Sequence, residues 1–586
     1  PFYNVCGGTQ DNNSLCGPSR TTVIHGITNS DWNMVLGGDG YEPQIDPNDP
    51  NIIYPQAQYG FLARYDRRTQ ERVYITPKPA SGEKQYKWNW NTPLLISPHS
   101  PTRLYYAAEY LFRSDDRGDS WQKISPDLTR QLDRNQLEVM GRVWGVDSVA
   151  KNDSTSMYGA AIMISESPLK EGLIFVSTDD GVINITEDGG SNWRRVEKFR
   201  GVPDMSYIDD VLASSHDENI AYAVFDNHKR GDYKPYVLKT DDRGKSWKSI
   251  AGNLPARGSA HTIVEDHVNP KLLFVGTEFG LFFTQDGGAN WTALKSNFPT
   301  IAVRDIEIQK RENDLVVGTF GRGIYIIDDY SALRTNKSDL GAEMLFPVRD
   351  PWLYIEGDLW DAREKGSMGA EFFTAKNPPY GAVFTYYLKD AVKSRQAARR
   401  EAEIEIEKTG GNTPYPNWDA LRDEDLEESP AVFLMVRDSD GTLVRQIEGE
   451  AAKGLHRSAW DLRLPAPDPI DLVDHGERPY WETPPAGPLA LPGEYTARLA
   501  VRKDGVLKEV SESQRFTVKA LNASPEITAD RKALQTFQLK VAKLQRAVLG
   551  STSVIGELNT RLAHIRAAII QTPSSGDAER AAVNQL

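Results

Sequence analysis

The sequence is poor in the residues that build metal and redox centres, and it has no long apolar run. It contains only two cysteines, and its nine histidines are scattered over 586 residues with no pair at a helical metal-binding spacing. No apolar stretch reaches the roughly 18–20 residues that span a bilayer. Acidic residues exceed basic ones by 82 − 68 = 14, and a polyanion partner would need clustered lysine and arginine. We therefore expect no metal, no cofactor, no nucleic-acid partner and no membrane span.

The two cysteines, Cys6 and Cys16, are ten residues apart, on the two sides of an expected hairpin. This spacing suits a disulfide in an oxidising compartment, and it equally suits two buried thiols. We expect the disulfide if the protein is exported.

One pattern, S/T-x-D-x-G-x-S/N-W, occurs four times. An aspartate in such a turn accepts backbone N–H bonds, the glycine supplies a positive φ, and the tryptophan buries its ring between sheets. The aspartates are 72, 54 and 44 residues apart, so the repeat is near 45 residues long, which fits a four-stranded propeller blade. The aspartate and tryptophan of the four copies are Asp116 and Trp121, Asp188 and Trp193, Asp242 and Trp247, and Asp286 and Trp291.

Apolar hairpins precede the copies and recur without them, for example at residues 315–325 and 3–12. We predict an all-β fold that begins with a β-propeller over residues 1–335, with about six blades and part of another. Residues 2–17 contain an inner hairpin but no preceding first strand. An open sheet edge is unfavourable, so we expect a missing N-terminal region or a partner chain to supply a strand beside Tyr3–Gly8.

The four copies resemble the Asp-box, or BNR repeat, of sialidases, xyloglucanases and sortilin-type propellers. With the segments at 37–40 (GGDG), 45–50 (IDPNDP), 90–93 (WNTP) and 318–323 (GTFGRG), the chain is similar to bacterial sortilin-like proteins often labelled glycosyl hydrolases, over residues 1 to about 525. The resemblance implies a propeller with its Asp-boxes in outer turns. Enzymes and receptors share this fold, so it does not choose between them.

The pattern changes after the propeller. Fewer and longer strands over residues 345–518 predict an immunoglobulin- or fibronectin-like β-sandwich, with a charged helical insertion at 391–428. Apolar residues spaced by three and four predict two amphipathic helices within 526–572. Gly550 and the residues up to Ser553 should break them, so we expect a hairpin whose helices pair with each other or with a partner helix.

No compact catalytic motif is present, so candidate site residues follow from the architecture. Propeller sites normally lie on the face that carries the loops between strands two and three and the loops entering strand one. Glycoside hydrolysis needs two carboxyl groups, and the catalytic candidates on that face are Asp39, Asp179, Asp180 and Glu278. The ligand-binding candidates, which combine aromatic rings with charges as sugar sites do, are Tyr59, Trp88, Trp90, Glu109, Arg142, Trp144, Tyr207, Arg304 and Arg322.

Several alternatives stay open for these residues. Trp88 and Trp90 also fit an inner-core position. Arg142, Arg304 and Arg322 resemble the arginine clamp of sialidases, but the Arg-Ile-Pro opening of those enzymes is absent, which favours ion pairs instead. Asp46, Asp49 and Asn51 are spaced like calcium donors and fit a capped turn better.

We interpret the chain as an exported sortilin-like propeller, secreted, periplasmic or at the cell surface. It would bind a peptide or polysaccharide, or act as a scaffold in an envelope assembly. The alternative is a glycoside hydrolase that uses a carboxylate pair on the central propeller face.

Overall fold

The computed structural model describes residues 2–153, 155–295, 297–336, 340–341, 343–358, 368–369, 371–470, 484–521 and 525–585, with the backbone alone at 525–529. The chain divides into two compact units. One comprises Phe2–Thr21 and Ile27–Asn336, and the other comprises Thr22–Gly26 together with the chain from Lys337 onward.

The first unit contains seven antiparallel sheets among its described residues. The first sheet consists of β1 (Asn4–Gly8), β2 (Ser14–Pro18) and β4 (Asn33–Leu36), and the last consists of β25 (Val303–Gln309), β26 (Asp314–Thr319) and β27 (Ile324–Ile327). The five sheets between them have four strands each: β5 (Gly40–Ile45), β6 (Ile52–Ala57), β7 (Phe61–Asp66) and β8 (Arg72–Tyr74); β9 (Leu94–Ile96), β10 (Leu104–Ala107), β11 (Leu111–Ser114) and β12 (Gln122–Lys123); β13 (Ala161–Glu166), β14 (Ile174–Thr178), β15 (Ile183–Thr186) and β16 (Arg194–Val196); β17 (Tyr207–Ala213), β18 (Ala221–Asn227), β19 (Asp232–Thr240) and β20 (Lys248–Ser249); β21 (Ala260–Glu265), β22 (Leu273–Thr277), β23 (Gly280–Thr284) and β24 (Thr292–Ala293).

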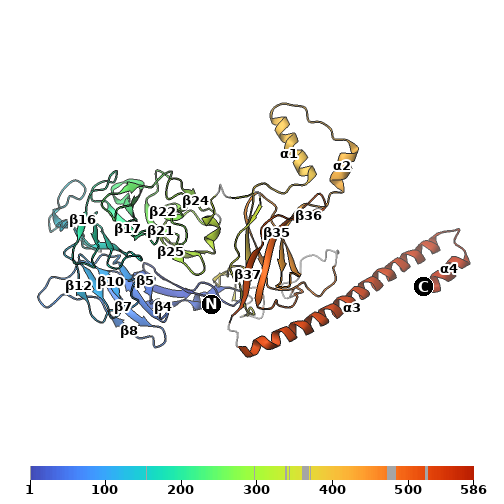
Figure 1. Ribbon diagram of the computed structural model, residues 1–586, viewed down its shortest axis with the longest axis horizontal. Helices are drawn as coiled ribbons and strands as arrows, with labels where there is room; N and C mark the ends of the chain where they lie inside the picture. Colours follow the sequence, from blue (N-terminus) through green and yellow to red (C-terminus); the bar gives the residue numbers. More distant parts are fainter. Residues whose placement is uncertain are drawn as a thin grey trace. The chain divides into compact units, whose positions relative to one another are not determined.

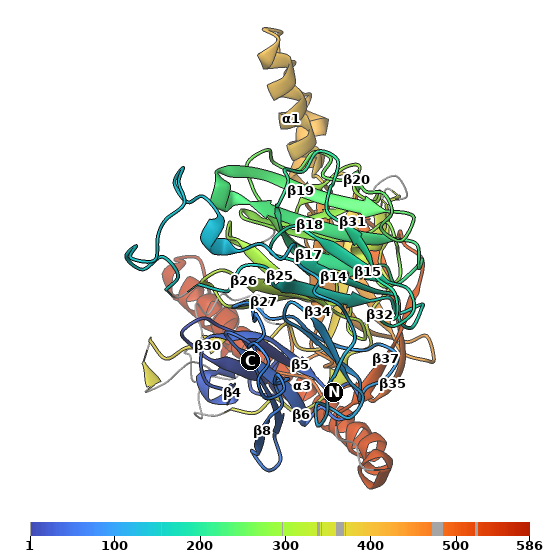
Figure 2. The same cartoon turned by 90° about the vertical axis from the view of Figure 1, so that its left-hand side faces the viewer.

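These sheets form a β-propeller (Figures 1 and 2). Each sheet contacts the next through its first strands, from β1 against β5 to β21 against β25. The first sheet also meets the last, because Tyr3 Oη donates a hydrogen bond of 2.8 Å to Asp314 and Arg20 lies 3.4 Å from Asp328. Among the described strands, β1 pairs only with β2, just as β5 pairs only with β6 and β21 only with β22. β1 is therefore itself the first strand of its sheet, which corrects the expectation that a first strand is missing beside it.

The sheet faces explain why these segments are so apolar. A blade is covered on both faces by its neighbours, and such strands are continuous hydrophobic runs rather than alternating ones. All seven residues of β18 are buried, as are all five of β14 and of β22. The core of the unit therefore lies between successive sheets, and the polar groups that remain on inner strands are exceptions to the pattern.

The four repeated turns connect the third and fourth strands of their blades. In each of them the aspartate accepts the backbone N–H four residues later at 2.8–2.9 Å, as Asp116 does from Ser120. Three of the tryptophans donate their indole N–H to the backbone of the preceding blade, as Trp291 does to Ile250 at 2.8 Å. Trp247 and Trp291 are buried, whereas Trp121 and Trp193 are half-buried. The turns therefore join neighbouring blades.

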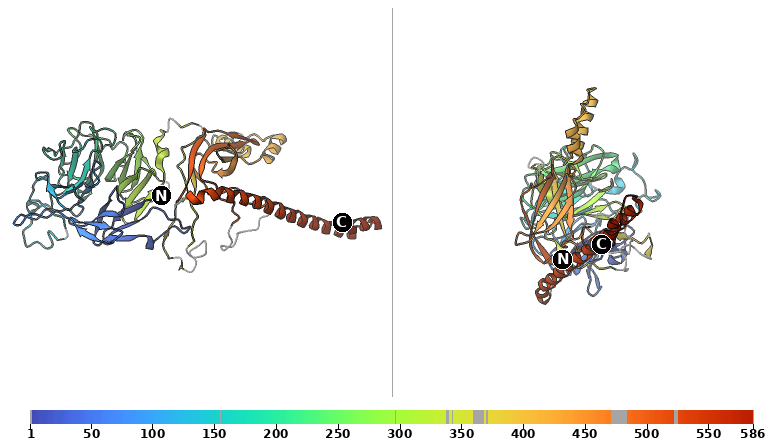
Figure 3. Two further views of the ribbon diagram at one scale, coloured as in Figure 1. Left: turned by 60° about the horizontal axis from the view of Figure 1, so that its bottom comes forward. Right: turned by 90° about the vertical axis from the view of Figure 1, so that its right-hand side faces the viewer.

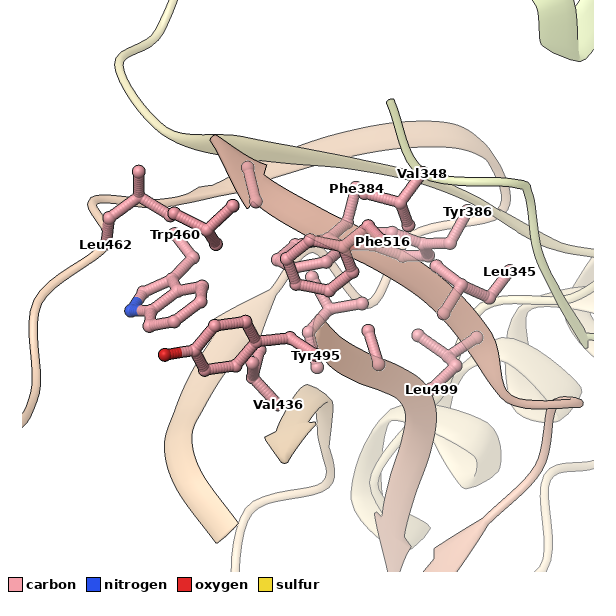
Figure 4. Close-up of a cluster of buried hydrophobic side chains, with 14 of the residues drawn as sticks. Leu345, Val348, Phe384, Tyr386, Val436, Trp460, Leu462, Tyr495, Leu499 and Phe516 are labelled. Carbon is pink, nitrogen blue, oxygen red and sulfur yellow. The ribbon is translucent and has the colours of Figure 1, made fainter. Parts of the chain in front are cut away.

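The second unit contains a β-sandwich. One sheet is formed by β28 (Glu343–Leu345), β31 (Ala382–Leu388) and β34 (Gly454–Trp460), and the other by β29 (Trp352–Leu353), β37 (Gln514–Ala520), β35 (Gly493–Lys503), β32 (Ala431–Arg437), β33 (Leu443–Gly449) and β36 (Val506–Glu509). Their inner faces share one core (Figure 4). In that core Trp460 lies 5.3 Å from Tyr495 and Phe384 lies 5.8 Å from Phe516, measured between ring centroids.

Among the described residues, α-helices occur only in this second unit, and the first unit has only short 3-10 turns. The charged segment forms α1 (Arg395–Lys408) and α2 (Trp418–Asp425), which have no buried residue. The predicted C-terminal hairpin is wrong, because α3 (Pro525–Gln571) is one continuous helix that runs through Gly550 (Figures 1 and 3). A glycine costs a helix interior only about 1 kcal/mol, and Ser551 and Thr552 bond back to carbonyls one turn earlier. A short helix, α4 (Asp577–Gln585), follows.

No helix in the described part of the chain has the length and apolarity needed to cross a bilayer.

Candidate functional site: a carboxylate cluster on the inner strands

The first strands of four successive blades, β13, β17, β21 and β25, carry a β-bulge at the same place, and in the last three the inserted residue is ionisable. The pairing register shifts between Ile208 and Asp210 in β17, between Ala260 and Thr262 in β21, and between Val303 and Asp305 in β25. Each bulge inserts one extra residue and re-aims its side chain. The inserted residues are Asp209, His261 and Arg304, so three ionisable groups occupy equivalent positions in neighbouring blades.

These three side chains form a hydrogen-bonded row that continues to Glu278. The His261 ring lies 2.9 Å from Asp209 through Nδ1 and 3.0 Å from Glu278 through Nε2. Arg304 Nη1 lies 3.0 Å from the same Nδ1, and its other terminal nitrogen lies 3.6 Å from Glu278. The His261 side chain is only 1% exposed, whereas that of Glu278 is 42% exposed. The row therefore runs from a buried imidazole to a carboxylate that solvent reaches.

Asp210 follows the bulge of β17, and its surroundings differ from those of Asp209. Its Oδ2 accepts hydrogen bonds from Thr262 Oγ1 at 3.1 Å and from the backbone N–H of Ile263 at 2.9 Å. Burial nevertheless dominates and raises the pKa of Asp210 to about 7. Asp210 is therefore a carboxyl group that holds a proton at mildly acidic pH, beside a carboxylate that His261 contacts.

Three further carboxyl groups from inner strands interact with Asp210. They are Glu42 on β5 and Asp305 and Glu307 on β25. Burial raises the pKa of each, and the negative charge of Asp305 raises those of Glu42 and Glu307 further. Like charges that face one another cannot all ionise, so this group retains protons near neutral pH.

Asp226, at the end of β18, completes a set of metal-capable donors. One ligand atom each from Asp209, Asp226 and His261 lie within 4.8 Å of one another. Burial acts to raise the pKa of Asp226, but hydrogen bonds from the backbone and ring of His228 outweigh it and lower the pKa. Two carboxylates and an imidazole could hold a divalent cation. A helical spacing of histidines does not reveal this set, because its members come from three different strands.

The structure separates the four predicted catalytic carboxylates. Glu278 belongs to the row just described. Asp179 is buried, accepts the N–H groups of Gly159 and Ala160, and has its pKa raised to about 7 by burial. Asp180 is fully buried and accepts bonds from Thr178 and from the backbone of Arg130. Asp39 accepts the N–H of Asp11 at 2.9 Å. Asp180 and Asp39 therefore fix local backbone.

The predicted ligand-binding aromatic residues also lie in different surroundings. Trp88 packs on Tyr106 and Phe112 in the core between blades, so its assignment to a ligand site is corrected in favour of the core alternative. Trp90 meets the partly exposed ring of Tyr59 edge to face at 4.9 Å.

Tyr207 begins β17, and burial together with the charges of Asp209 and Asp179 raises its pKa. It is thus the predicted aromatic residue that belongs with the carboxylate cluster. Glu109 is buried and accepts the backbone N–H of Lys87, so it holds a turn rather than a ligand.

The predicted arginines do not gather. Arg304 belongs to the row with His261, whereas Arg142 stacks on Trp144 with its guanidinium carbon 3.5 Å from the ring centroid. Arg322 is exposed in the turn before β27. Asp46, the first calcium candidate, accepts two N–H groups of its own turn and pairs with Arg117 at 2.9 Å, which is the capped-turn alternative.

Part of the chain is similar in sequence to xyloglucanases. The chain is 23% identical over 274 residues to xyloglucanase Xgh74A of Acetivibrio thermocellus, which covers 41% of this chain and 29% of that protein. It is 21% identical over 257 residues to an oligoxyloglucan-reducing end-specific xyloglucanase of Emericella nidulans, covering 41% and 27%. The matches therefore span less than a third of each relative. No family model matches the chain.

Two solved structures are also similar. One is the GH74 xyloglucanase of Xanthomonas campestris, with 14% identity and a TM-score of 0.38, covering 87% of this chain and 95% of that one. The other is YCF48 of Cyanidioschyzon merolae, with 14% identity and a TM-score of 0.34, covering 53% of this chain and 89% of that one. The sheets of the chain form a β-propeller, and its sequence is weakly similar to xyloglucanases. The sequence matches favour the hydrolase alternative over the binding or scaffolding interpretation.

Proposed function

We propose that the propeller hydrolyses glycosidic bonds in a xyloglucan-like polysaccharide, with Asp210 and Asp209 as the reacting carboxyl groups. The observation that carries this proposal is the pair of adjacent aspartates on β17 that lie in different surroundings. Asp210 has a pKa raised to about 7, and Asp209 bonds to His261. Glycosidases need one protonated and one ionised carboxyl group beside the scissile bond.

The two aspartates have separate roles in this proposal. The protonated carboxyl of Asp210 gives its proton to the leaving oxygen as the bond to the anomeric carbon breaks. The carboxylate of Asp209 stabilises the positive charge that develops on the sugar ring, and it either attacks the anomeric carbon or activates a water molecule. His261 holds Asp209 in place through the 2.9 Å contact with Nδ1, and Tyr207 begins the same strand. Tyr59 and Trp90 offer an aromatic pair on which a sugar could stack.

The same proposal places the protein outside the cytoplasm. Cys6 and Cys16 face each other across β1 and β2 and are joined by a disulfide. Such bonds persist in oxidising compartments, which is also where a polysaccharide substrate is met.

The test measures reducing ends released from xyloglucan, with other β-glucans as alternative substrates. Replacing a general acid typically costs on the order of 10²–10⁴ in rate, so we expect Asp210→Asn to lose this much on polysaccharide. In an aryl glycoside with an acidic phenol, the phenolate leaves without needing a proton. Asp210→Asn should therefore keep most of its activity on that substrate. Asp209→Asn should lose activity on both.

Asp39→Asn is the matched control, because Asp39 is an aspartate of the same propeller whose carboxylate accepts the backbone N–H of Asp11. It should retain wild-type rates. If the wild-type chain releases no reducing ends but is retained by a xyloglucan affinity gel, the binding alternative replaces hydrolysis. If Asp210→Asn and Asp209→Asn behave alike on both substrates, the assignment of roles is wrong.

A further inference from the structure

The long helix α3 has an apolar seam that the described residues of its own unit leave open. Nine large apolar residues along it are between 45% and 66% exposed, and all of them except Val554 lie on one seam. They lie on a helix with no break over 47 residues. The eight residues, which define the α3 seam, are Leu534, Phe537, Val541, Leu544, Val548, Ile555, Leu558 and Ile565.

The seam follows a heptad repeat without interruption. Starting at Leu534, the spacing alternates strictly between three and four up to Ile569, and the one polar residue in the series is Ser551. In heptad terms Leu534 is an a position and Phe537 a d position. Sustained 3–4 spacing over several heptads is the pattern of a coiled coil rather than of a helix packed on a sheet.

The seam is distinct from the side of α3 that meets its own unit. Gln535 donates to the carbonyl of Leu489 at 2.8 Å, and Arg546 donates to that of Ala466 at 2.7 Å. Ala542, between these two, is half-buried. All three residues occupy b or f positions, away from a and d, and a further contact, from Gln545 to Asp468 at 3.0 Å, lies at an e position. The helix is therefore anchored through one side while the seam faces outward.

Other helices of the described chain do not supply a partner for the whole seam. α1 and α2 are mainly polar and have no buried residue. α4 has nine residues and contacts α3, with Val583 buried. Leu562 and Ile569, near the end of α3, are half-buried, so the open part of the seam runs from Leu534 to about Leu558.

We propose that α3 pairs with α3 of a second copy of this chain as a parallel two-stranded coiled coil. The residue types select this occupant. β-Branched residues at a with leucine at d favour parallel dimers over trimers and tetramers. Four of the six a positions are β-branched, namely Val541, Val548, Ile555 and Ile569. Two of the five d positions, Leu544 and Leu558, are leucine, and the other three are Phe537, Ser551 and Ile565.

Charge and area agree with pairing between identical helices. The flanking e and g positions from Ala533 to Asn559 carry one charge, that of Lys540, so like charges do not oppose one another across the seam. Eight half-exposed side chains at roughly 80–100 Å² each offer about 700 Å² per helix, close to the ~800 Å² per partner of a stable interface. The like-charged Arg561 and Arg566 fall in the last heptad, where α4 follows.

The test is the mass of the full chain in solution, measured by light scattering and sedimentation at micromolar concentration. We expect twice the chain mass of 65.5 kDa. Lysines at two d positions, Leu544→Lys with Leu558→Lys, should weaken the dimer on the order of 100-fold or more, because each places a charge in an apolar seam. The matched control is Ser553→Lys with Thr560→Lys, which adds the same charges at f positions and should stay dimeric.

A cysteine variant tests the orientation. The native cysteines are already paired, so Leu544→Cys introduces one free thiol per chain. A parallel, in-register dimer brings the two thiols together, and mild oxidation should cross-link most of the protein. A monomeric wild type, a trimer or tetramer, a dimer insensitive to the two d-position lysines, or a dimer that does not cross-link through Leu544→Cys would each overturn the proposal.

Discussion

Aspartates in the outer turns and aspartates on the inner strands of the propeller have opposite acid–base behaviour. Asp116, in a repeated turn, accepts bonds from the hydroxyl and N–H of Ser120, and these lower its pKa to about 2. Asp210, on an inner strand, also accepts two bonds, but burial raises its pKa to about 7. Hydrogen-bond donors decide the outer case, and loss of water decides the inner one.

The comparison separates stability from chemistry. A carboxylate in an exposed, donor-rich turn stabilises the folded state by being ionised, and it has no proton to give near neutral pH. A buried carboxyl group destabilises the folded state when it ionises, and it retains a proton that a substrate can take. The sequence uses the same residue type in both places, so only the surroundings distinguish the two roles.

The largest effect is expected from the tryptophans of the repeated turns. Trp291→Ala removes a buried ring that bonds to the backbone of the neighbouring blade. It should lower the free energy of unfolding by about 3–5 kcal/mol. Denaturant unfolding measures this, with circular dichroism as the signal because it does not rely on tryptophan fluorescence. Trp418→Ala, at a side chain 79% exposed, should change it by less than about 0.5 kcal/mol. If Trp291→Ala and Trp418→Ala changed the free energy of unfolding equally, the repeated turns would not have the structural role assigned to them.

Replacing the inner aspartate, Asp210, should change the free energy of unfolding by an amount that depends on pH. Unlike most substitutions of buried polar groups, this one should stabilise the protein. The folded pKa of Asp210, about 7, lies above its unfolded value of about 3.9. The folded state therefore binds more protons between these values, and this group makes stability fall as the pH rises from 4 to 7. Asp210→Asn mimics the protonated form, so it should be neutral at pH 4 and stabilising by on the order of 2–3 kcal/mol at pH 8. Thermal and denaturant unfolding at both pH values would measure this, and destabilisation at pH 8 would contradict it.

The outer aspartate should show the reverse dependence. The folded pKa of Asp116, about 2, lies below its unfolded value, so its stabilisation is present above about pH 4 and is lost as the pH falls towards 2. Asp116→Asn keeps the shape but loses the charge. We expect a loss of about 1–2 kcal/mol at pH 7 that shrinks at low pH. A constant difference across this range would mean that the charge is irrelevant.

The smallest effect is expected at Asp39, which the sequence suggested as catalytic and the structure places in a loop. Asp39→Asn keeps an oxygen that can accept the N–H of Asp11. The free energy of unfolding should change by less than about 0.5 kcal/mol, and the hydrolysis rate should stay at the wild-type level. A hundredfold loss of rate would return Asp39 to the site.

The sequence was informative where structure is local. The repeated turns follow from residues within eight positions of each other, so their spacing predicts both the blades and the aspartate bonds. The carboxylate cluster was missed because β-bulges create it. Asp209, His261 and Arg304 are about fifty and forty residues apart and share no motif. Aligning the first strands, YIDDVLA, AHTIVE and VRDIEIQ, would have shown an ionisable residue at one equivalent position in three blades.

The C-terminal error has a similar origin. The 3–4 spacing on each side of Gly550 was read as two helices, since glycine is a common helix breaker. The heptad repeat continues across it, with Ser551 at a d position, and that continuity indicated one helix.

The most direct test of the account is the pH dependence of kcat/KM for xyloglucan hydrolysis by the full chain. If Asp210 supplies the proton, the rate should fall on the alkaline side with an apparent pKa near 7, the value set by its burial. Asp39→Asn should leave this limb in place, and Asp210→Asn should abolish it along with most of the rate. An alkaline limb that is unchanged in Asp210→Asn, or no hydrolysis at any pH between 4 and 8, would contradict the account.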